Sequence, residues 1–317
     1  MSKVTAEEAI VEHEHKNVVV VGVDGSEPAK QALKWAAAQA RQRKASLHLL
    51  CIFELPSYAV NAGEDAQAAP GGALLYEAAE TMVKEMARSP ELAGLEVTWS
   101  LLDGDPSERL IEMSKDVALV VVGGHGDSRG SIADRLLRTV STAVPAYAYC
   151  PTVVVPHLGK DVSETNLPVR TVLVGADGSD HAKLALQRAI WEADRWNAKL
   201  TVVTAVNVDV ASWMPQFSLS PDLLAGIAET IQEQVDELRE GRDIEIEVLA
   251  LEGNPAKLMA EYSAQVDLMV MGTRGRGGFS GLLLGSTSQT VLEYTACPTM
   301  VVPRRVRPGD DQGPVKE

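Results

Sequence analysis

The 317-residue chain contains one sequence pattern twice, and this duplication constrains its fold more than any other feature. A run of hydrophobic residues ends in Asp-Gly-Ser, with Asp24 in the first copy and Asp177, 153 residues later, in the second. Near the end of each copy stands Cys-Pro-Thr-x-Val-Val-Pro, which begins at Cys150 and again at Cys297. Because about 150 residues is a usual domain size, the sequence predicts two similar domains in tandem.

Polar segments without a periodic pattern mark the ends and the middle of the chain. Such segments are typical of mobile termini and of short connections between domains. We therefore expect a flexible N-terminus at 1–16, a first domain at 17–157, a linker at 158–168, a second domain at 169–304 and a flexible C-terminus at 305–317.

The composition excludes several classes of partner and location. A formal net charge of −15 disfavours nucleic acid and anionic membranes, since both need a basic binding surface. Three cysteines do not make a disulfide framework. No stretch approaches the roughly 18 consecutive apolar residues of a membrane span, so we expect a cytoplasmic protein.

Short β-branched runs alternate with helical periods in both copies. Runs such as Val18–Val21 and Leu119–Val122 are apolar at consecutive positions, which is typical of parallel strands covered on both faces. Pro106 and Pro255 each follow an N-cap type of residue and predict the start of a helix. Each copy is therefore expected to form an α/β domain: a doubly wound, Rossmann-like fold with an open five-stranded parallel sheet and helices on both faces.

In such a sheet, ligands bind at the carboxyl ends of the strands. The loop after the first strand carries Asp177, for which two interpretations remain open: a turn residue, or an acceptor for the polar edge of a nucleoside. The loop after the fourth strand is rich in glycine from Gly272 to Gly278, and Gly285-Ser286 opens the next helix. It could be a flexible surface loop, or its amides and the helix N-terminus could cradle a phosphate.

Other signals are weaker. The chain has no Gly-x-x-x-x-Gly-Lys-Ser/Thr motif, so efficient ATP hydrolysis is not expected. The glycine loop also lacks the spacing of a dinucleotide fingerprint. His13 and His15 lie in the N-terminal segment without the spacing of a metal-binding helix, and we assign no metal ligand and no catalytic residue.

Spacing favours the phosphate cradle. The pattern Gly272-x-x-Gly275, then nine residues, then Gly285-Ser286, together with the aspartate after strand one, resembles the ATP-binding pattern of the universal stress protein family. The resemblance runs from about Asn17 to Pro303 and is most similar to the tandem form, in which two domains pack as a pseudo-dimer within one chain.

The resemblance implies the following site residues. In the second copy, adenine and ribose contacts would fall on Gly175, Asp177, Ala205 and Met271, and phosphate contacts on Gly272, Arg274, Gly275, Gly277, Gly285 and Ser286. The equivalent first-copy positions are Gly22, Asp24, Ile52, Val122, Gly123, Gly126 and Thr139.

The first copy departs from the family's pattern. Eleven residues rather than nine follow Gly126, and the Gly-Ser pair is replaced by Arg138-Thr139. His125 stands in place of Arg274, and Pro145 falls inside the expected last helix, where it removes a backbone donor. We therefore expect one nucleotide per chain, bound by the second domain.

Three hypotheses for function follow from these features. The first is a stress-response regulator that binds ATP, with or without Mg²⁺, and changes conformation or a partner surface with nucleotide occupancy. The second is a slow ATPase or autophosphorylating enzyme, since Ser286, Thr287 and Ser288 would lie beside the terminal phosphate. The third is a nucleotide-independent scaffold, in which the pseudo-dimer pairs further into a homodimer.

Overall fold

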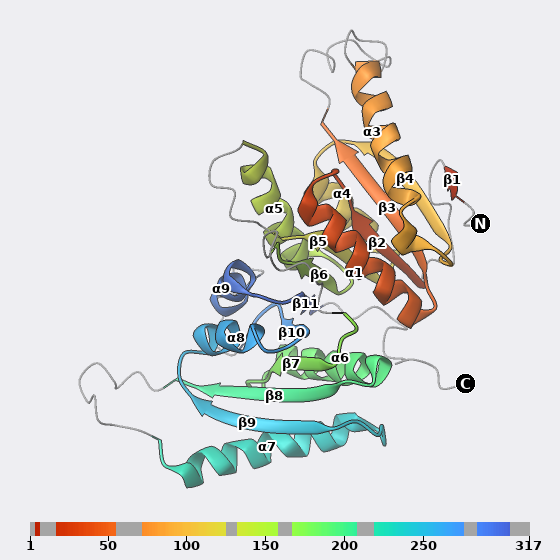
Figure 1. Ribbon diagram of the computed structural model, residues 1–317. Coiled ribbons are helices and arrows are strands. Elements are labelled where there is room, and N and C mark those ends of the chain that lie inside the picture. Colours follow the sequence, from red (N-terminus) through yellow and green to blue (C-terminus); the bar gives the residue numbers. More distant parts are fainter. Residues whose placement is uncertain are drawn as a thin grey trace. The chain divides into compact units, whose positions relative to one another are not determined.

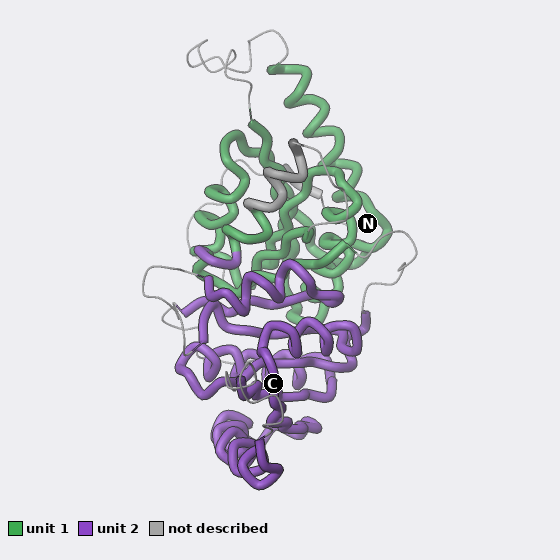
Figure 2. Tube along the Cα trace, turned by 90° about the vertical axis from the view of Figure 1, so that its left-hand side faces the viewer, with its two compact units in different colours: residues 1–144, 148–165 green, residues 145–147, 166–317 purple. Residues whose placement is uncertain are grey.

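The structure is a computed structural model, and it describes residues 4–6, 17–54, 72–124, 132–157, 167–207, 219–275 and 284–304. The chain divides into two compact units (Figure 2). Unit 1 comprises residues 1–144 and 148–165, and unit 2 comprises residues 145–147 and 166–317. The main division at 165/166 falls within the segment expected as a linker. No helix among the described residues is long and apolar enough to cross a membrane.

Unit 1 alternates strands and helices along the chain (Figure 1). Its elements are β1 (Val4–Ala6), β2 (Val18–Gly22), α1 (Glu27–Arg43), β3 (Ser46–Phe53), α3 (Gly72–Ala87), a 3-10 turn (Pro90–Leu92), β4 (Val97–Asp103), α4 (Pro106–Met113), β5 (Leu119–Gly123), α5 (Ile132–Tyr147) and β6 (Thr152–Val155).

Unit 2 repeats this order. Its elements are β7 (Thr171–Gly175), α6 (Asp180–Trp196), β8 (Lys199–Val206), α7 (Pro221–Arg239), β9 (Ile246–Glu252), α8 (Pro255–Ser263), β10 (Leu268–Gly272), α9 (Ser286–Tyr294) and β11 (Thr299–Val302).

Both units have the expected doubly wound topology. The strand order is β1-β4-β3-β2-β5-β6 in unit 1 and β9-β8-β7-β10-β11 in unit 2, with parallel pairing between these neighbours. From β7 the chain moves outward to β8 and β9, and then crosses back to β10 on the other side of β7. The winding direction therefore reverses between β7 and β10, where a crevice for a ligand is expected.

Local sequence signals explain the start of the main helices. Ser26 and Ser179 cap α1 and α6 by accepting hydrogen bonds from the amides of Ala29 and Ala182, both at 3.2 Å. Both helices bury a stripe of mostly small residues, so they can lie close to the sheet. Asp105 caps α4 and Asn254 caps α8 in the same way, each with proline at the first helical position, as expected.

One expectation about the N-terminus is wrong. Within the segment 1–16, which was expected to be flexible, Val4–Ala6 forms β1 and pairs in parallel with β4 from Val97 to Trp99. Without β1, β4 would be the edge strand of unit 1, with a row of unpaired backbone donors and acceptors. Three residues of strand are too few to give a recognisable sequence pattern, and unit 1 thus adds a sixth strand to the five expected.

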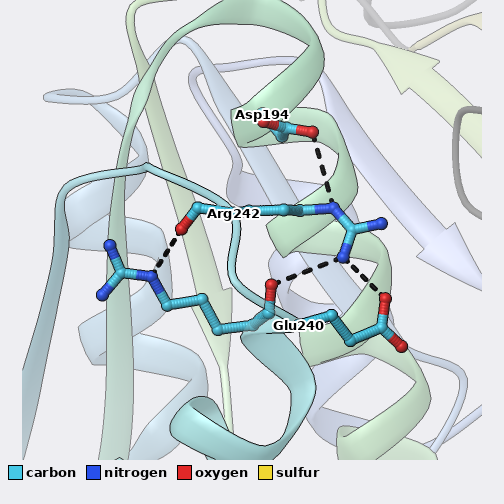
Figure 3. A network of polar contacts seen from close by, with 4 residues as sticks. Asp194, Glu240 and Arg242 are labelled. Carbon is cyan, nitrogen blue, oxygen red and sulfur yellow. Dashed lines mark hydrogen bonds and ion pairs between the residues drawn. The ribbon is translucent and has the colours of Figure 1, made fainter. Parts of the chain in front are cut away.

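The buried Arg242 connects the turn after α7 to α6 through polar contacts (Figure 3). The Arg242 side chain is 7% exposed, its Nε lies 3.4 Å from Asp194 Oδ2, and its Nη1 donates to Glu240 Oε2 at 2.7 Å. The Arg239 guanidinium in turn donates to the carbonyls of Arg242 and Ile244 at 2.7 and 2.9 Å. This network stabilises the turn that leads into β9, at the amino end of that strand.

Candidate functional site

Unit 2 contains a cavity of about 560 Å³ at the carboxyl ends of β7, β8 and β10. It therefore lies at the reversal of the winding direction. The residues that line it come from β7, β8 and β10, the loops that follow them, and helices α6 to α9: Gly175, Ala176, Asp177, Ala182, Val203, Thr204, Ala205, Val206, Asn207, Ile227, Pro255, Met259, Met271, Gly272, Arg274, Gly275, Gly285, Ser286, Thr287 and Ser288.

The fold brings together residues that the sequence predicted from distant segments. Nine of the ten second-copy positions line this one cavity: Gly175, Asp177, Ala205, Met271, Gly272, Arg274, Gly275, Gly285 and Ser286. The tenth, Gly277, lies outside the described residues, as do Arg276 and Gly278.

Asp177 forms a turn and also faces the cavity. Its Oδ1 accepts a hydrogen bond from the amide of Ser179 at 3.0 Å, which is the turn role that the sequence suggested. Its Oδ2 lies so close to Gly275 that a side chain at residue 275 would overlap the carboxylate. The structure thus explains why the loop after β10 needs glycine at this position: the loop passes directly over Asp177.

Gly272 and Gly175 are also needed for packing. A Cβ on Gly272 would lie 2.9 Å from the carbonyl oxygen of His181 at the start of α6, and one on Gly175 would lie 3.2 Å from Cε of Met259 on α8. These glycines therefore let the helices approach the strand ends, whatever the cavity binds.

The N-terminus of α9 opens toward the cavity. Gly285 at the N-cap has no side chain to accept from the first turn, while its own amide donates to the carbonyl of Thr273 at 2.8 Å. Ser286 is exposed and Thr287 half-buried on the cavity wall. The first-turn amides of a helix carry partial positive charge and attract anions.

Ser288 lines the cavity together with Ser286 and Thr287. Its buried hydroxyl donates to the carbonyl of Gly272 at 3.0 Å and ties α9 to the end of β10. The Ser288 hydroxyl is thus engaged with the backbone, whereas Ser286 is exposed and Thr287 is half-buried.

The wall of the cavity has an apolar part and a polar part. The apolar side chains are those of Val203, Ile227, Met259 and Met271, and the polar groups include the glycine backbone and the first turn of α9. Asp177 and Arg274 are the charged residues of the described wall.

His181 lies next to this charged region, one residue before Ala182 on the cavity wall. Its pKa is lowered, first by burial and then by the positive charges of Arg304 and Arg274, while Asp180 and Asp177 act in the opposite direction. The imidazole is therefore neutral at neutral pH, and it reports the positive potential at this edge of the sheet.

The sequence patterns did not predict the part of the cavity wall that the helices contribute. Pro255 could have been found, because its helix begins at the same edge of the sheet as the two predicted loops. Ile227 on α7 and Met259 on α8 carry no motif, and only the packing of their helices brings them to the cavity. Thr204 and Asn207 lie close to the predicted Ala205 and could have been inferred from their position at the end of β8.

Five of the seven first-copy positions occupy the same places in unit 1. Gly22 ends β2, Ile52 lies on β3, and Val122 and Gly123 end β5. Asp24 Oδ1 accepts from the amide of Ser26 at 2.9 Å, so its turn matches that of Asp177.

The remaining two first-copy positions cannot be compared in the same way. Gly126 lies outside the described residues, and Thr139 lies in α5, in a part where the side chains are not described. Pro145 does fall inside α5, as expected.

Several side chains at equivalent places differ between the units. Leu110 contacts Gly22 where Met259 contacts Gly175, and Cys51 on β3 stands in the place of the cavity residue Thr204. Burial, and secondarily the charge of Asp24, raises the pKa of the Cys51 thiol to about 11, so this thiol stays protonated at neutral pH. Cys51 is therefore a packing residue rather than a reactive one.

The described residues do not offer a metal centre. No group of three or more His, Cys, Asp or Glu side chains among them could hold a metal ion. A Mg²⁺ ion that accompanied a nucleotide would have to take most of its ligands from phosphate oxygens and water, which is usual for Mg²⁺.

Comparison with known proteins gives the family. The model of the universal stress protein family matches residues 16–156 and again residues 168–303. A universal stress protein of Mycobacterium tuberculosis is 30% identical over 296 residues, which cover 89% of this chain and 95% of the relative. One from Mycolicibacterium smegmatis is 31% identical over 300 residues, with 90% and 96% covered.

Solved structures agree on the fold. A universal stress protein from Archaeoglobus fulgidus superposes with a TM-score of 0.65 at 24% identity, covering 93% of this chain and 98% of that chain. The duplication seen in the sequence is thus two copies of the domain that the family model describes, and the chain belongs to the universal stress protein family in its tandem, two-domain form.

Proposed function

We propose that unit 2 binds an adenine nucleotide, ATP in particular, and that nucleotide occupancy regulates a stress response. The observation that carries the proposal is the cavity at the β7/β10 reversal, in which nine residues that the family resemblance implied from separate segments converge. An adenine ring fits the apolar wall near Ala205, Ile227 and Met271, and the phosphates fit the glycine loop and the α9 N-terminus.

The cavity favours binding over turnover. Asp177 is the carboxylate on the described wall, and its Oδ1 already accepts the Ser179 amide. Ser288, one of three hydroxyls considered for autophosphorylation, donates to a backbone carbonyl instead. Phosphoryl transfer or hydrolysis would need a general base next to a nucleophile. Neither of these two contacts provides that arrangement.

A regulator needs a ligand that binds two conformations differently, because equal binding shifts no equilibrium. The loop after β10 is the segment that such a ligand would affect first, since it passes over Asp177 and leads to α9. We expect ATP to protect the amides of residues 272–275 and of the first turn of α9 from hydrogen exchange.

Isothermal titration of the full chain with ATP tests the proposal. We expect the wild-type protein to bind ATP saturably. Titration with a nicotinamide dinucleotide should release no more heat than dilution does. Absence of ATP binding, with an oligomer size that ATP does not change, would instead support a nucleotide-independent scaffold.

A further inference from the structure

A second arginine leaves the sheet next to Arg274. Strands β10 and β11 are parallel neighbours, and Gly272 pairs with Val302 at their carboxyl ends. The Thr273 amide donates to the Val302 carbonyl at 3.3 Å, so the pairing continues past the end of β10. Arg274 and Arg304 each follow this paired position by two residues, and neighbouring strands lie about 4.8 Å apart. The two arginines therefore follow the carboxyl ends of neighbouring strands at matching positions, on the same edge of the sheet.

The charges of both arginines lower the pKa of the same imidazole. His181 on α6 feels the positive charge of Arg304 and, to a smaller degree, that of Arg274. His181 itself stands in the first turn of α6. That turn borders the cavity through Ala182.

Arg304 is exposed, and no carboxylate of the described residues forms an ion pair with it. In a chain with a net charge of −15, such an arginine at the edge of a binding site keeps its charge available for an anion. Unit 1 has no counterpart: His157 stands at the equivalent position, with Nδ1 3.3 Å from Gln31 Oε1, and Pro28 replaces His181.

We propose that Arg304 is a second phosphate-binding residue of the unit 2 site, one that favours nucleoside triphosphates over monophosphates. The proposal rests on the nucleotide binding proposed above. Arg274 lines the cavity and is within reach of any phosphate bound there. Arg304 is not among the residues that line the cavity, and it follows β11, the strand next to β10. A monophosphate ends near Arg274, whereas a triphosphate continues from it and gains the second guanidinium.

Calorimetric titrations with AMP and ATP, at fixed Mg²⁺ and salt, test this assignment. In Arg304→Gln we expect ATP affinity to fall about 5- to 10-fold, as for a partly exposed charge contact, with AMP affinity changed less than about twofold. Arg304→Lys keeps the charge and should keep most of the ATP preference. Arg170→Gln is the matched control: it removes an exposed arginine at the amino end of β7, and it should leave the ATP-to-AMP ratio unchanged.

Equal losses for AMP and ATP in Arg304→Gln, or no loss for ATP, would overturn the role of Arg304. If the wild-type chain bound neither nucleotide, the proposed function itself would fail instead. A second measurement needs no ligand. Because Arg304 lowers the pKa of His181, Arg304→Gln should raise the His181 pKa in an NMR titration of the free protein. An unchanged His181 pKa would show that Arg304 points away from the site.

Discussion

Units 1 and 2 carry the same loop after their first strand, yet the two loops have different surroundings. Asp24 and Asp177 make the same turn. In each, Oδ1 accepts a hydrogen bond from the amide two residues later, at 2.9 Å in unit 1 and 3.0 Å in unit 2. Asp24 is exposed, whereas Asp177 is half-buried and lies against Gly275. The residues that both copies share therefore build the scaffold, and they do not by themselves make a binding site.

The residues that differ between the copies surround the cavity. Thr204 and Met259 line it in unit 2, where unit 1 has Cys51 and Leu110. His181, beside the cavity, replaces Pro28. A duplicated domain can keep its fold through caps and small-residue helix stripes while its loops diverge, so the mismatches between copies are where a difference in function should be sought.

The largest effect should come from Gly275→Val. The new side chain would overlap the Asp177 carboxylate and force the loop after β10 out of place. We expect ATP affinity to fall at least about 100-fold, or about 2.7 kcal/mol. Gly226→Ala on α7 is the matched control, since a Cβ there contacts nothing within 4 Å. Normal ATP binding by Gly275→Val in a calorimetric titration would show that this loop is not part of the site.

Arg242→Met should separate stability from binding. It keeps the aliphatic packing but removes the ion pairs to Asp194 and Glu240, both partly exposed, so we expect a loss of about 1–2 kcal/mol. Faster hydrogen exchange in α6 and α7, with unchanged ATP affinity, is the expected result. Lost ATP binding in a folded variant would mean that the network shapes the cavity as well.

The parts of the fold that the sequence predicted are those with local causes. Ser179 caps α6 and Asn254 caps α8 through contacts three residues away, so their roles can be inferred from neighbouring letters. The cavity walls at Ile227 and Met259 depend on how α7 and α8 pack, which no local pattern encodes. Strand β1 was missed for the same reason: its partner β4 is about 90 residues away along the chain.

The paired variants Asp24→Asn and Asp177→Asn compare the two turns directly. Asparagine keeps the side-chain oxygen that accepts the serine amide, so each variant should lose less than about 1 kcal/mol of stability. Only Asp177→Asn should weaken ATP binding, by about tenfold, because its carboxylate faces the cavity. An equal loss of ATP affinity in Asp24→Asn would remove the asymmetry between the units.

The smallest effect concerns the buried thiols. Burial, as the largest cause, raises the pKa of Cys51 to about 11 and that of Cys297 to about 12, from an ordinary value of 9.0. A raised folded-state pKa means that the native thiol holds its proton above pH 9 while the unfolded one loses it, so stability falls as pH rises from 9 toward 11.

At pH 9.5, each thiol should lower the free energy of unfolding by less than about 1 kcal/mol relative to pH 8. Urea denaturation at both pH values measures this loss, and Cys51→Ala should reduce it. A stability that does not change between pH 8 and 10, or thiols that react with alkylating reagents in the folded protein at pH 8, would contradict the burial of these groups.

Native mass spectrometry of the full chain with ATP counts the nucleotides that each chain binds. We expect one ATP per chain, lost in Gly275→Val and retained in Asp24→Asn. Two bound nucleotides, or one that Gly275→Val retains and Asp24→Asn loses, would contradict the assignment of binding to unit 2.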